Sequence, residues 1–111
     1  MKKINILKNS RDFDRIIKNN TSYKYKDYIF YLEKNTKDVF KFGLSVGKKI
    51  GNAVTRNAIK RKIRQSLLEL KPMIKADIDF IVIARPPTAE MSTEEVKKSL
   101  IHVLKLAHVM E

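Results

Sequence analysis

Residues 40–70 constrain the fold most, because the spacing of their apolar residues changes partway along. The first part alternates apolar residues with small or polar ones, which predicts a strand with one buried face. Its apolar positions are Phe40, Phe42, Leu44 and Val46. Beyond Val54 the apolar residues recur at helical spacing, which predicts a helix with one face packed on a core. That face consists of Ile59, Ile63, Leu67 and Leu70.

A short loop joins this strand to this helix. Gly47 and Gly51 bracket the loop, since closely spaced glycines interrupt regular structure. Either Asn52 or Thr55 can serve as the N-cap of the helix, and Pro72 stops it beyond Leu70. We therefore expect a strand, a loop and a helix in immediate succession.

Positive charge is concentrated in the same region. Residues 41–64 hold eight of the 24 Lys and Arg residues of the chain and no Asp or Glu, while the net charge is +12. Like charges one helical turn apart destabilise an isolated helix, and a bound polyanion would remove that cost. A merely solvated basic face is the alternative, but such faces usually intersperse acidic residues. The pattern predicts a nucleic-acid-binding surface.

The N-terminal half adds a helix and strands. Phe13, Ile16 and Ile17 have helical spacing, which predicts a short helix over residues 11–18. Residues 22–34 are rich in aromatic and β-branched side chains and form either one long strand or two strands broken near Asp27. A turn at residues 35–38 would make residues 28–46 an antiparallel hairpin.

The C-terminal part supplies one more strand and one more helix. Residues 80–84 are uninterruptedly apolar, which is typical of a strand buried on both faces. Ser92 and Glu95 have the spacing of a capping box, and an amphipathic helix follows to about His108. The expected order is α-β-(β)-β-α-β-α, an α+β fold arranged as a two-layer α/β sandwich. Residues 1–111 are expected to form one domain, with residues 1–9 as an extended arm.

The sequence offers no self-sufficient catalytic group. The chain has no cysteine, and its two histidines, His102 and His108, project in different directions from the last helix. Asp77 and Asp79 could hold a metal ion, but a turn-capping role fits them better, so no metal site is predicted. No apolar run reaches the roughly 18–20 residues of a membrane span, and we expect a cytoplasmic protein that contacts no membrane.

The basic stretch also carries a family resemblance. The run GLSV-x-KKIGNAV-x-RN-x-IKR-x-IRQ resembles the signature of the bacterial ribonuclease P protein component. Its central positions here are Arg56, Asn57, Lys60, Arg61 and Arg64, preceded by Lys48, Lys49, Gly51 and Asn52. The resemblance implies a left-handed crossover through the basic helix between the last two strands.

The resemblance also implies two RNA partners and no protein partner. In this family the RNA subunit is the catalyst of an endoribonuclease and binds most of the Mg²⁺, while the protein binds that RNA and the 5′ leader of precursor tRNA. The expected contacts with the RNA subunit are Lys48, Lys49, Asn52, Arg56, Asn57, Lys60, Arg61 and Arg64. The expected contacts with the leader, in a cleft between the first helix and the sheet, are Phe13, Ile17, Lys24, Lys26, Tyr28 and Tyr31.

Two alternatives stay open at this point. Phe13 has the spacing of a core residue as well as that of a base-stacking one, while Phe30 fits the core better. Ile17 stands where the family commonly has an aromatic residue. A non-enzymatic RNA-binding protein of ribosomal type has the same size and charge. A stand-alone nuclease is disfavoured, because it would need clustered carboxylates or a histidine pair.

Overall fold

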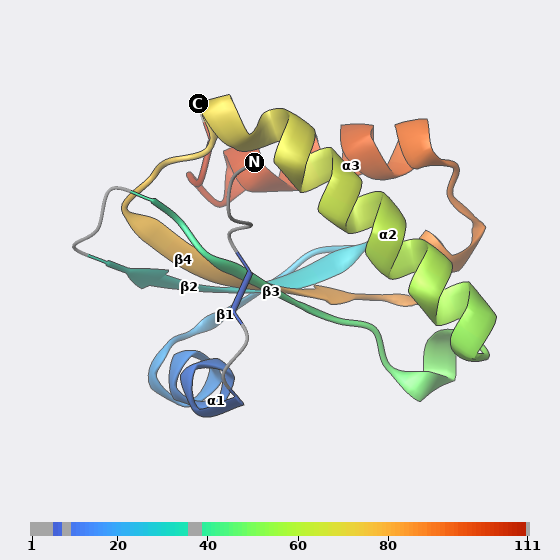
Figure 1. Ribbon diagram of the computed structural model, residues 1–111, viewed down its shortest axis with the longest axis horizontal. Coiled ribbons are helices and arrows are strands. Elements are labelled where there is room, and N and C mark those ends of the chain that lie inside the picture. The colour runs from blue at the N-terminus through green and yellow to red at the C-terminus, as the bar shows by residue number, and fades with distance from the viewer. Residues whose placement is uncertain (1–5, 8–9, 36–38, 111) are drawn as a thin grey trace.

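The computed structural model describes residues 6–7, 10–35 and 39–110, which form a mixed sheet covered by helices (Figure 1). The strands are β1 (Ser22–Lys24), β2 (Tyr28–Lys34), β3 (Phe42–Ser45) and β4 (Ile78–Ala84). The α-helices are α1 (Ser10–Asn19), α2 (Ala53–Leu70) and α3 (Thr93–Leu106). The described residues also include the short 3₁₀ segments η1 (Lys48–Ile50), η2 (Lys71–Met73) and η3 (Pro86–Glu90).

Strand β4 is a central strand of the sheet, whose order is β1-β2-β4-β3. It pairs antiparallel with β2 and parallel with β3. Its residues Phe80, Ile81 and Val82 are completely buried, because helices cover both faces of the sheet at this point. The expectation of a strand buried on both faces is confirmed.

The expected hairpin of residues 28–46 is wrong. β2 pairs with β1 and β4 rather than with β3, and β4 lies between them. A strand that is apolar on both faces is most stable at the centre of a sheet, where it also pairs along both edges. The rings of Phe30, Phe80 and Phe42 then stack across three adjacent strands, with neighbouring centroids 6.1 Å apart. Residues 36–38 of the expected turn lie outside the described residues.

The segment 22–34 forms two strands, which confirms one of the two predicted alternatives. The break falls at residues 25–27, where the Tyr25 amide donates to the Tyr28 carbonyl across 2.8 Å. At the far edge of the sheet, Ile6 forms a parallel bridge with Phe42. Of the expected arm, residues 1–5 and 8–9 lie outside the described part of the chain.

Two apolar clusters lie on opposite faces of the sheet. Figure 1 shows α2 and α3 on one face of the sheet and α1 on the other. Phe30, Phe80 and Val82 pack on the first face, and Ile81 packs with Ile16 of α1 on the second. The α2 positions predicted to face the core, Ile59, Ile63, Leu67 and Leu70, are each at most 1% exposed. The α+β class is therefore confirmed. The β3–α2–β4 connection is a crossover between parallel strands, and its handedness stays a prediction.

The helix ends follow the sequence signals. Asn52 caps α2, its side-chain oxygen accepting from the Thr55 amide at 2.9 Å. Ser92 and Glu95 form the expected capping box at the start of α3. That helix ends at Leu106, and His108 adopts a φ of 61°, the left-handed conformation common just after a helix.

Asp79 has a structural role at the edge of the core. Its Oδ1 atom accepts hydrogen bonds from the Asn35 side chain at 2.6 Å and from the Lys41 amide at 2.9 Å. This carboxylate therefore ties the ends of β2 and β3 to β4. Within residues 6–7, 10–35 and 39–110 no group of three or more His, Asp or Glu residues could hold a metal ion, and no helix there could cross a membrane.

Shortening Ile63 should destabilise the fold strongly. Ile63→Ala leaves a cavity in the middle of the α2 stripe and is expected to lower the free energy of unfolding by about 2–4 kcal/mol. Arg61→Ala, on the exposed side of the same helix, serves as the control and should change it little. Thermal or urea unfolding of the two variants tests the face assignment, which fails if Arg61→Ala is as destabilising as Ile63→Ala.

Candidate RNA-binding surfaces

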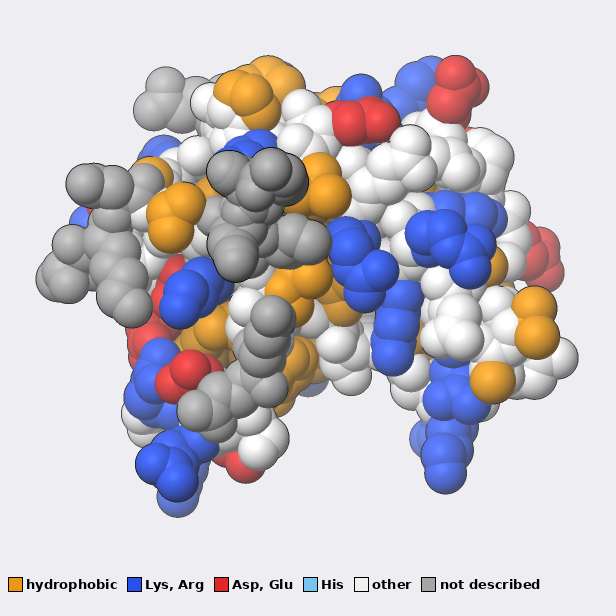
Figure 2. Space-filling view, viewed as in Figure 1, with side chains coloured by type: hydrophobic (Ala, Val, Ile, Leu, Met, Phe, Trp, Pro, Cys, Tyr) orange, Lys and Arg blue, Asp and Glu red, His pale blue; other side chains and the backbone are white. Residues whose placement is uncertain are grey.

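The predicted RNA-subunit contacts form one continuous basic surface on α2 and η1. We define the basic surface as Lys48, Lys49, Asn52, Arg56, Asn57, Lys60, Arg61 and Arg64. Arg56, Lys60 and Arg64 are half-buried, and the other five are exposed. Figure 2 shows Lys and Arg side chains gathered over α2 and, below it, over the segment that contains η1. The five predicted residues of α2 fall within about 140° around the helix axis, and Lys48, Lys49 and Asn52 lie in the segment that leads directly into that helix.

Arg56 connects the loop to the helix within this surface. Its Nε atom donates to the Gly51 carbonyl at 3.2 Å, one residue before the Asn52 cap. The bond holds the guanidinium over the start of α2 and fixes the loop that carries Lys48 and Lys49. Lys62 takes a different direction, since its ammonium donates to the Met91 carbonyl at 2.8 Å. Lys62 therefore braces α2 against the segment that leads into α3.

The second candidate surface is a hollow on the α1 face of the sheet. Strand pairing places Lys24, Ile29, Ile83 and Ser45 side by side in one row across β1, β2, β4 and β3. Helix α1 covers the neighbouring row, which contains Tyr31, Ile81 and Gly43, and leaves this row open. The hollow has a volume of about 760 Å³, and its lining includes Ile29, Ile83, Lys48, Lys49 and Arg85.

Two projections flank this hollow. Figure 1 places α1 below one half of the sheet and η1 below the other half, and Figure 2 shows basic side chains on both projections with a recess between them. The floor contributed by Ile29 and Ile83 is apolar. A recess with an apolar floor and cationic sides suits a single-stranded nucleic acid, whose bases are apolar on their faces and whose backbone is anionic.

An ion-pair network sets the rotation of α1 above the sheet. Arg15 donates to Glu33 of β2 at 2.8 Å and to Asp12 at 2.6 Å. The hydrogen bond to Glu33, followed by that to Asp12, raises the pKa of the Arg15 guanidinium above its usual range. At about 100° per residue, Phe13 and Ile17 leave the helix on the side opposite to Arg15. They therefore lie on the side of α1 that faces away from Glu33.

The predicted leader contacts occupy different parts of this face, with one exception. Phe13 and Tyr31 are half-buried against the Ile81 cluster, and Ile17 is 36% exposed. Lys24 is exposed at the β1 end of the floor, and Lys26 is exposed in the connection that follows. Phe13 thus packs against the Ile81 cluster and also lines a smaller hollow at the β3 edge, which is why its spacing alone left both alternatives open.

Tyr28 is the exception, and its prediction as a leader contact is wrong. It is completely buried on the α2 and α3 face, because side chains alternate along β2 and Tyr28 falls in phase with Phe30. Burial raises the pKa of Tyr28 to about 12. The ring lies edge-on to Phe30, with centroids 6.2 Å apart. Its neighbour Ile29 takes the place on the open floor.

Sequence reasoning missed the floor itself. Ile29, Ile83 and Ser45 lie in the open row, and Arg85 follows β4 at its end, where its Nη1 atom donates to the Tyr25 carbonyl at 3.1 Å. Because side chains alternate along residues 80–84, Ile83 and Val82 point to opposite faces of the sheet. Both faces of this strand are apolar, so the sequence does not show which of them is open. Only the pairing register and the position of α1 show which face stays open.

A smaller hollow at the β3 edge joins the basic surface to α1. Its volume is about 120 Å³, and it is lined by Phe13 from α1, Leu44 from β3, and Lys60 and Arg64 from α2, together with Ile6, Leu7 and Phe42. The Arg64 Nε atom is buried there without a hydrogen-bond partner. The basic surface and the α1 face therefore meet at Phe13.

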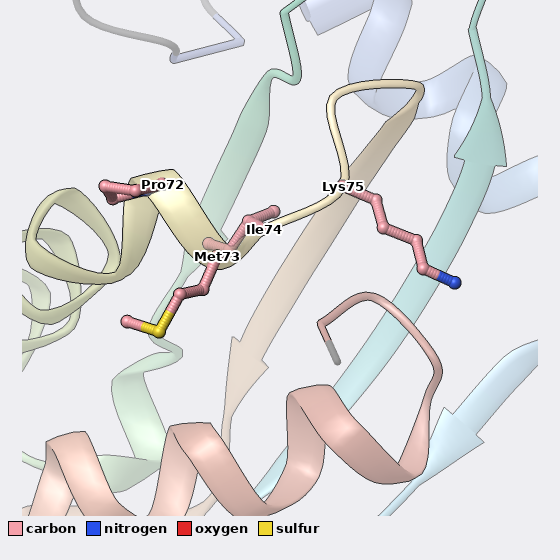
Figure 3. A pocket seen from close by; sticks show the side chains of 4 residues that line it. All are labelled: Pro72, Met73, Ile74 and Lys75. Carbon is pink, nitrogen blue, oxygen red and sulfur yellow. The ribbon is translucent and has the colours of Figure 1, made fainter.

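A third hollow lies far from both surfaces. Pro72, Met73, Ile74 and Lys75 line about 350 Å³ beyond the end of α2 (Figure 3). All four residues come from one short segment, and no other element contributes a charged or polar side chain to that lining. A further hollow of about 440 Å³ is lined by residues of both charge signs, namely Glu69, Thr93, Glu94, Lys97, Lys98 and Ile101. The basic surface and the 760 Å³ hollow, whose charged lining is basic, are the features that suit an anionic ligand.

Comparison with known proteins agrees with this geometry. The Ribonuclease P family profile matches residues 1–108. The chain is 50% identical to the ribonuclease P protein component of Enterococcus faecalis, an alignment that covers 100% of this chain and 95% of the relative.

Solved structures agree in fold as well. The Staphylococcus aureus RNase P protein is 43% identical, with a TM-score of 0.88 over 98% of this chain and 100% of that one. The Thermotoga maritima protein is 29% identical, with a TM-score of 0.82 over 90% and 94%. The sequence profile and the whole topology are thus those of one family, and this chain belongs to the ribonuclease P protein family.

Proposed function

We propose that this chain binds the catalytic RNA subunit through the basic surface and the 5′ leader of precursor tRNA through the hollow beside α1. The observation that carries the proposal is the adjacency of these two features, because Lys48 and Lys49 of the basic surface also line the 760 Å³ hollow. The RNA subunit then hydrolyses the phosphodiester bond and holds most of the Mg²⁺. The protein works in the cytoplasm by positioning the leader next to that RNA.

The hollow suits an unpaired strand better than a duplex. Ile29 and Ile83 offer an apolar floor to base faces, while Lys24 at one end and Lys48 and Lys49 on the opposite wall can contact phosphates. Stacking and apolar contacts accept every base, so they bind leaders of different sequence. Mature tRNA has no leader and should gain nothing from this hollow.

The direct test measures cleavage of a precursor tRNA at the leader junction. The purified chain should cleave nothing alone and should stimulate cleavage when the RNA subunit is present. Failure to stimulate would favour the alternative of a ribosomal-type RNA-binding protein. Cleavage by the protein without RNA would favour a stand-alone nuclease instead.

Binding to the RNA subunit should weaken steeply with salt. If about five residues of the basic surface contact phosphates, the slope of log K against log salt should be near −3.5 to −4.5, at roughly −0.7 to −0.9 per contact. Arg61→Ala should weaken binding and make the slope shallower by about one. Titrations monitored by fluorescence anisotropy at several salt concentrations measure both quantities.

Lys98→Ala is the matched control for Arg61→Ala. Lys98 is an exposed residue of α3, outside the basic surface, so its removal costs the same unit of charge. In Lys98→Ala the slope of log K against log salt should remain close to that of the unmodified chain. A wild-type slope shallower than about −1, or equal effects of the two substitutions, would contradict the assignment of the basic surface.

Removing the Phe13 ring should affect precursor tRNA selectively. In the complex with the RNA subunit, Phe13→Ala is expected to weaken precursor binding by roughly five- to thirtyfold, which corresponds to about 1–2 kcal/mol of lost stacking. Mature tRNA binding should not change. The affinities for both RNAs and a melting curve of the variant make up the measurement.

Leu106→Ala provides the control for loss of an apolar side chain elsewhere. Leu106 is 51% exposed at the end of α3 and contributes to neither hollow. The Leu106→Ala substitution should leave the ratio of precursor to mature tRNA affinity unaltered. If Phe13→Ala destabilises the domain and leaves that ratio unaltered as well, Phe13 serves only in packing.

A further inference from the structure

Gly43 occupies an unusual position under the Phe13 ring. It lies buried in the middle of β3, paired with Ile81 of β4, on the face that α1 covers. A β-carbon at this position would lie 2.8 Å from Phe13 Cζ, 3.2 Å from Cδ2 and closer still to Cε2. One edge of the Phe13 ring therefore rests directly on the glycine backbone.

The backbone conformation does not explain this glycine. Gly43 has no positive φ, so any L-residue could adopt its conformation. A glycine inside a strand weakens the strand, because it gains no side-chain packing and loses more chain entropy on folding. Gly51, by comparison, lies in a loop, and a β-carbon at Gly47 would meet nothing within 4 Å. What distinguishes Gly43 is the space that its missing side chain leaves for the ring.

The height of the ring above the sheet determines what it can contact. Phe13 stands between the row that α1 covers and the small hollow lined by Leu44, Lys60 and Arg64. A separation below 3.0 Å is one that real side chains do not tolerate, so a methyl group at residue 43 must push the ring or α1 away. The ring would then no longer rest on β3 beside the small hollow.

We infer that Gly43 is a positioning residue for leader binding: it seats the Phe13 ring against β3 at the height from which the ring stacks on an unpaired base. The inference rests on the proposed function. Gly43 itself contacts no RNA in this account, and its whole effect passes through Phe13. A substitution at Gly43 should therefore change leader binding only while the Phe13 ring is present. A merely structural role of Gly43 would not show this dependence on the ring.

The test combines Gly43→Ala with Phe13→Leu, which has no ring atoms at the site of the clash. The four chains, each assembled with the RNA subunit, are compared for the affinity ratio of precursor to mature tRNA. Gly43→Ala alone is expected to lower this ratio by about three- to tenfold, less than the full loss of a stacking ring. In the Phe13→Leu chain the same substitution should lower the ratio no further.

Two accompanying measurements separate positioning from general damage. The affinity for the RNA subunit should be the same in all four chains, because the basic surface is untouched. Melting curves show which chains are folded. If the Gly43→Ala chain does not fold, the inference is tested by comparing the affinity ratio of Phe13→Leu with that of the double variant. Both of these chains lack the Phe13 ring and so have room for a methyl group at residue 43. Equal ratios in these two chains support the inference, and a further loss in the double variant overturns it.

The remaining outcomes distinguish this inference from the proposed function. A folded Gly43→Ala chain with an unchanged ratio, beside a lowered ratio in Phe13→Leu, overturns the positioning role alone. An unchanged ratio in Phe13→Leu with intact RNA-subunit binding overturns the positioning role as well, because the ring then contributes nothing to leader binding. Equal affinity of the wild-type complex for precursor and mature tRNA overturns both the positioning role and the proposed leader binding.

Discussion

The burial of β4 on both faces is the constraint on which the rest of the structure depends. Phe80, Ile81 and Val82 are completely buried, and their side chains alternate between two apolar clusters. Such a strand gains the most from a central position, where it also pairs along both edges. Because β3 pairs parallel with β4, the chain must cross from one end of the sheet to the other between them, and α2 makes that crossing.

This arrangement gives the two faces of the sheet different roles. The face that holds Phe30 and Val82 is closed by α2 and α3, and α2 carries the basic surface on its outer side. The opposite face is only half closed, because α1 covers the row of Ile81 and leaves the row of Ile83 open. An open apolar floor costs stability in a folded chain, and it is useful when a partner covers it. The unpaired leader is the partner that we propose.

Much of this organisation can be predicted from the sequence, because it follows from local spacing. The Ile63 face of α2, the Asn52 cap and the Ser92–Glu95 capping box all depend on residues a few positions apart. The strand order does not follow from local spacing, since the partner of β3 lies beyond an entire helix. Adjacency in the sequence therefore wrongly suggested a hairpin of β2 and β3. Tyr28 was misassigned for a related reason: in a dense aromatic run, the phase of the strand is decided only by its neighbours.

Crosslinking from the leader tests most directly whether the hollow beside α1 binds the unpaired strand. A precursor tRNA with a photoreactive base in the leader would be bound to the protein assembled with the RNA subunit, irradiated, and the crosslinked peptides identified. Our account predicts crosslinks to the lining of the hollow around Ile29 and Ile83, and to the neighbouring helix α1 around Phe13 and Ile17. Crosslinks confined to the outer side of α3, around Lys98 and His102, would contradict it.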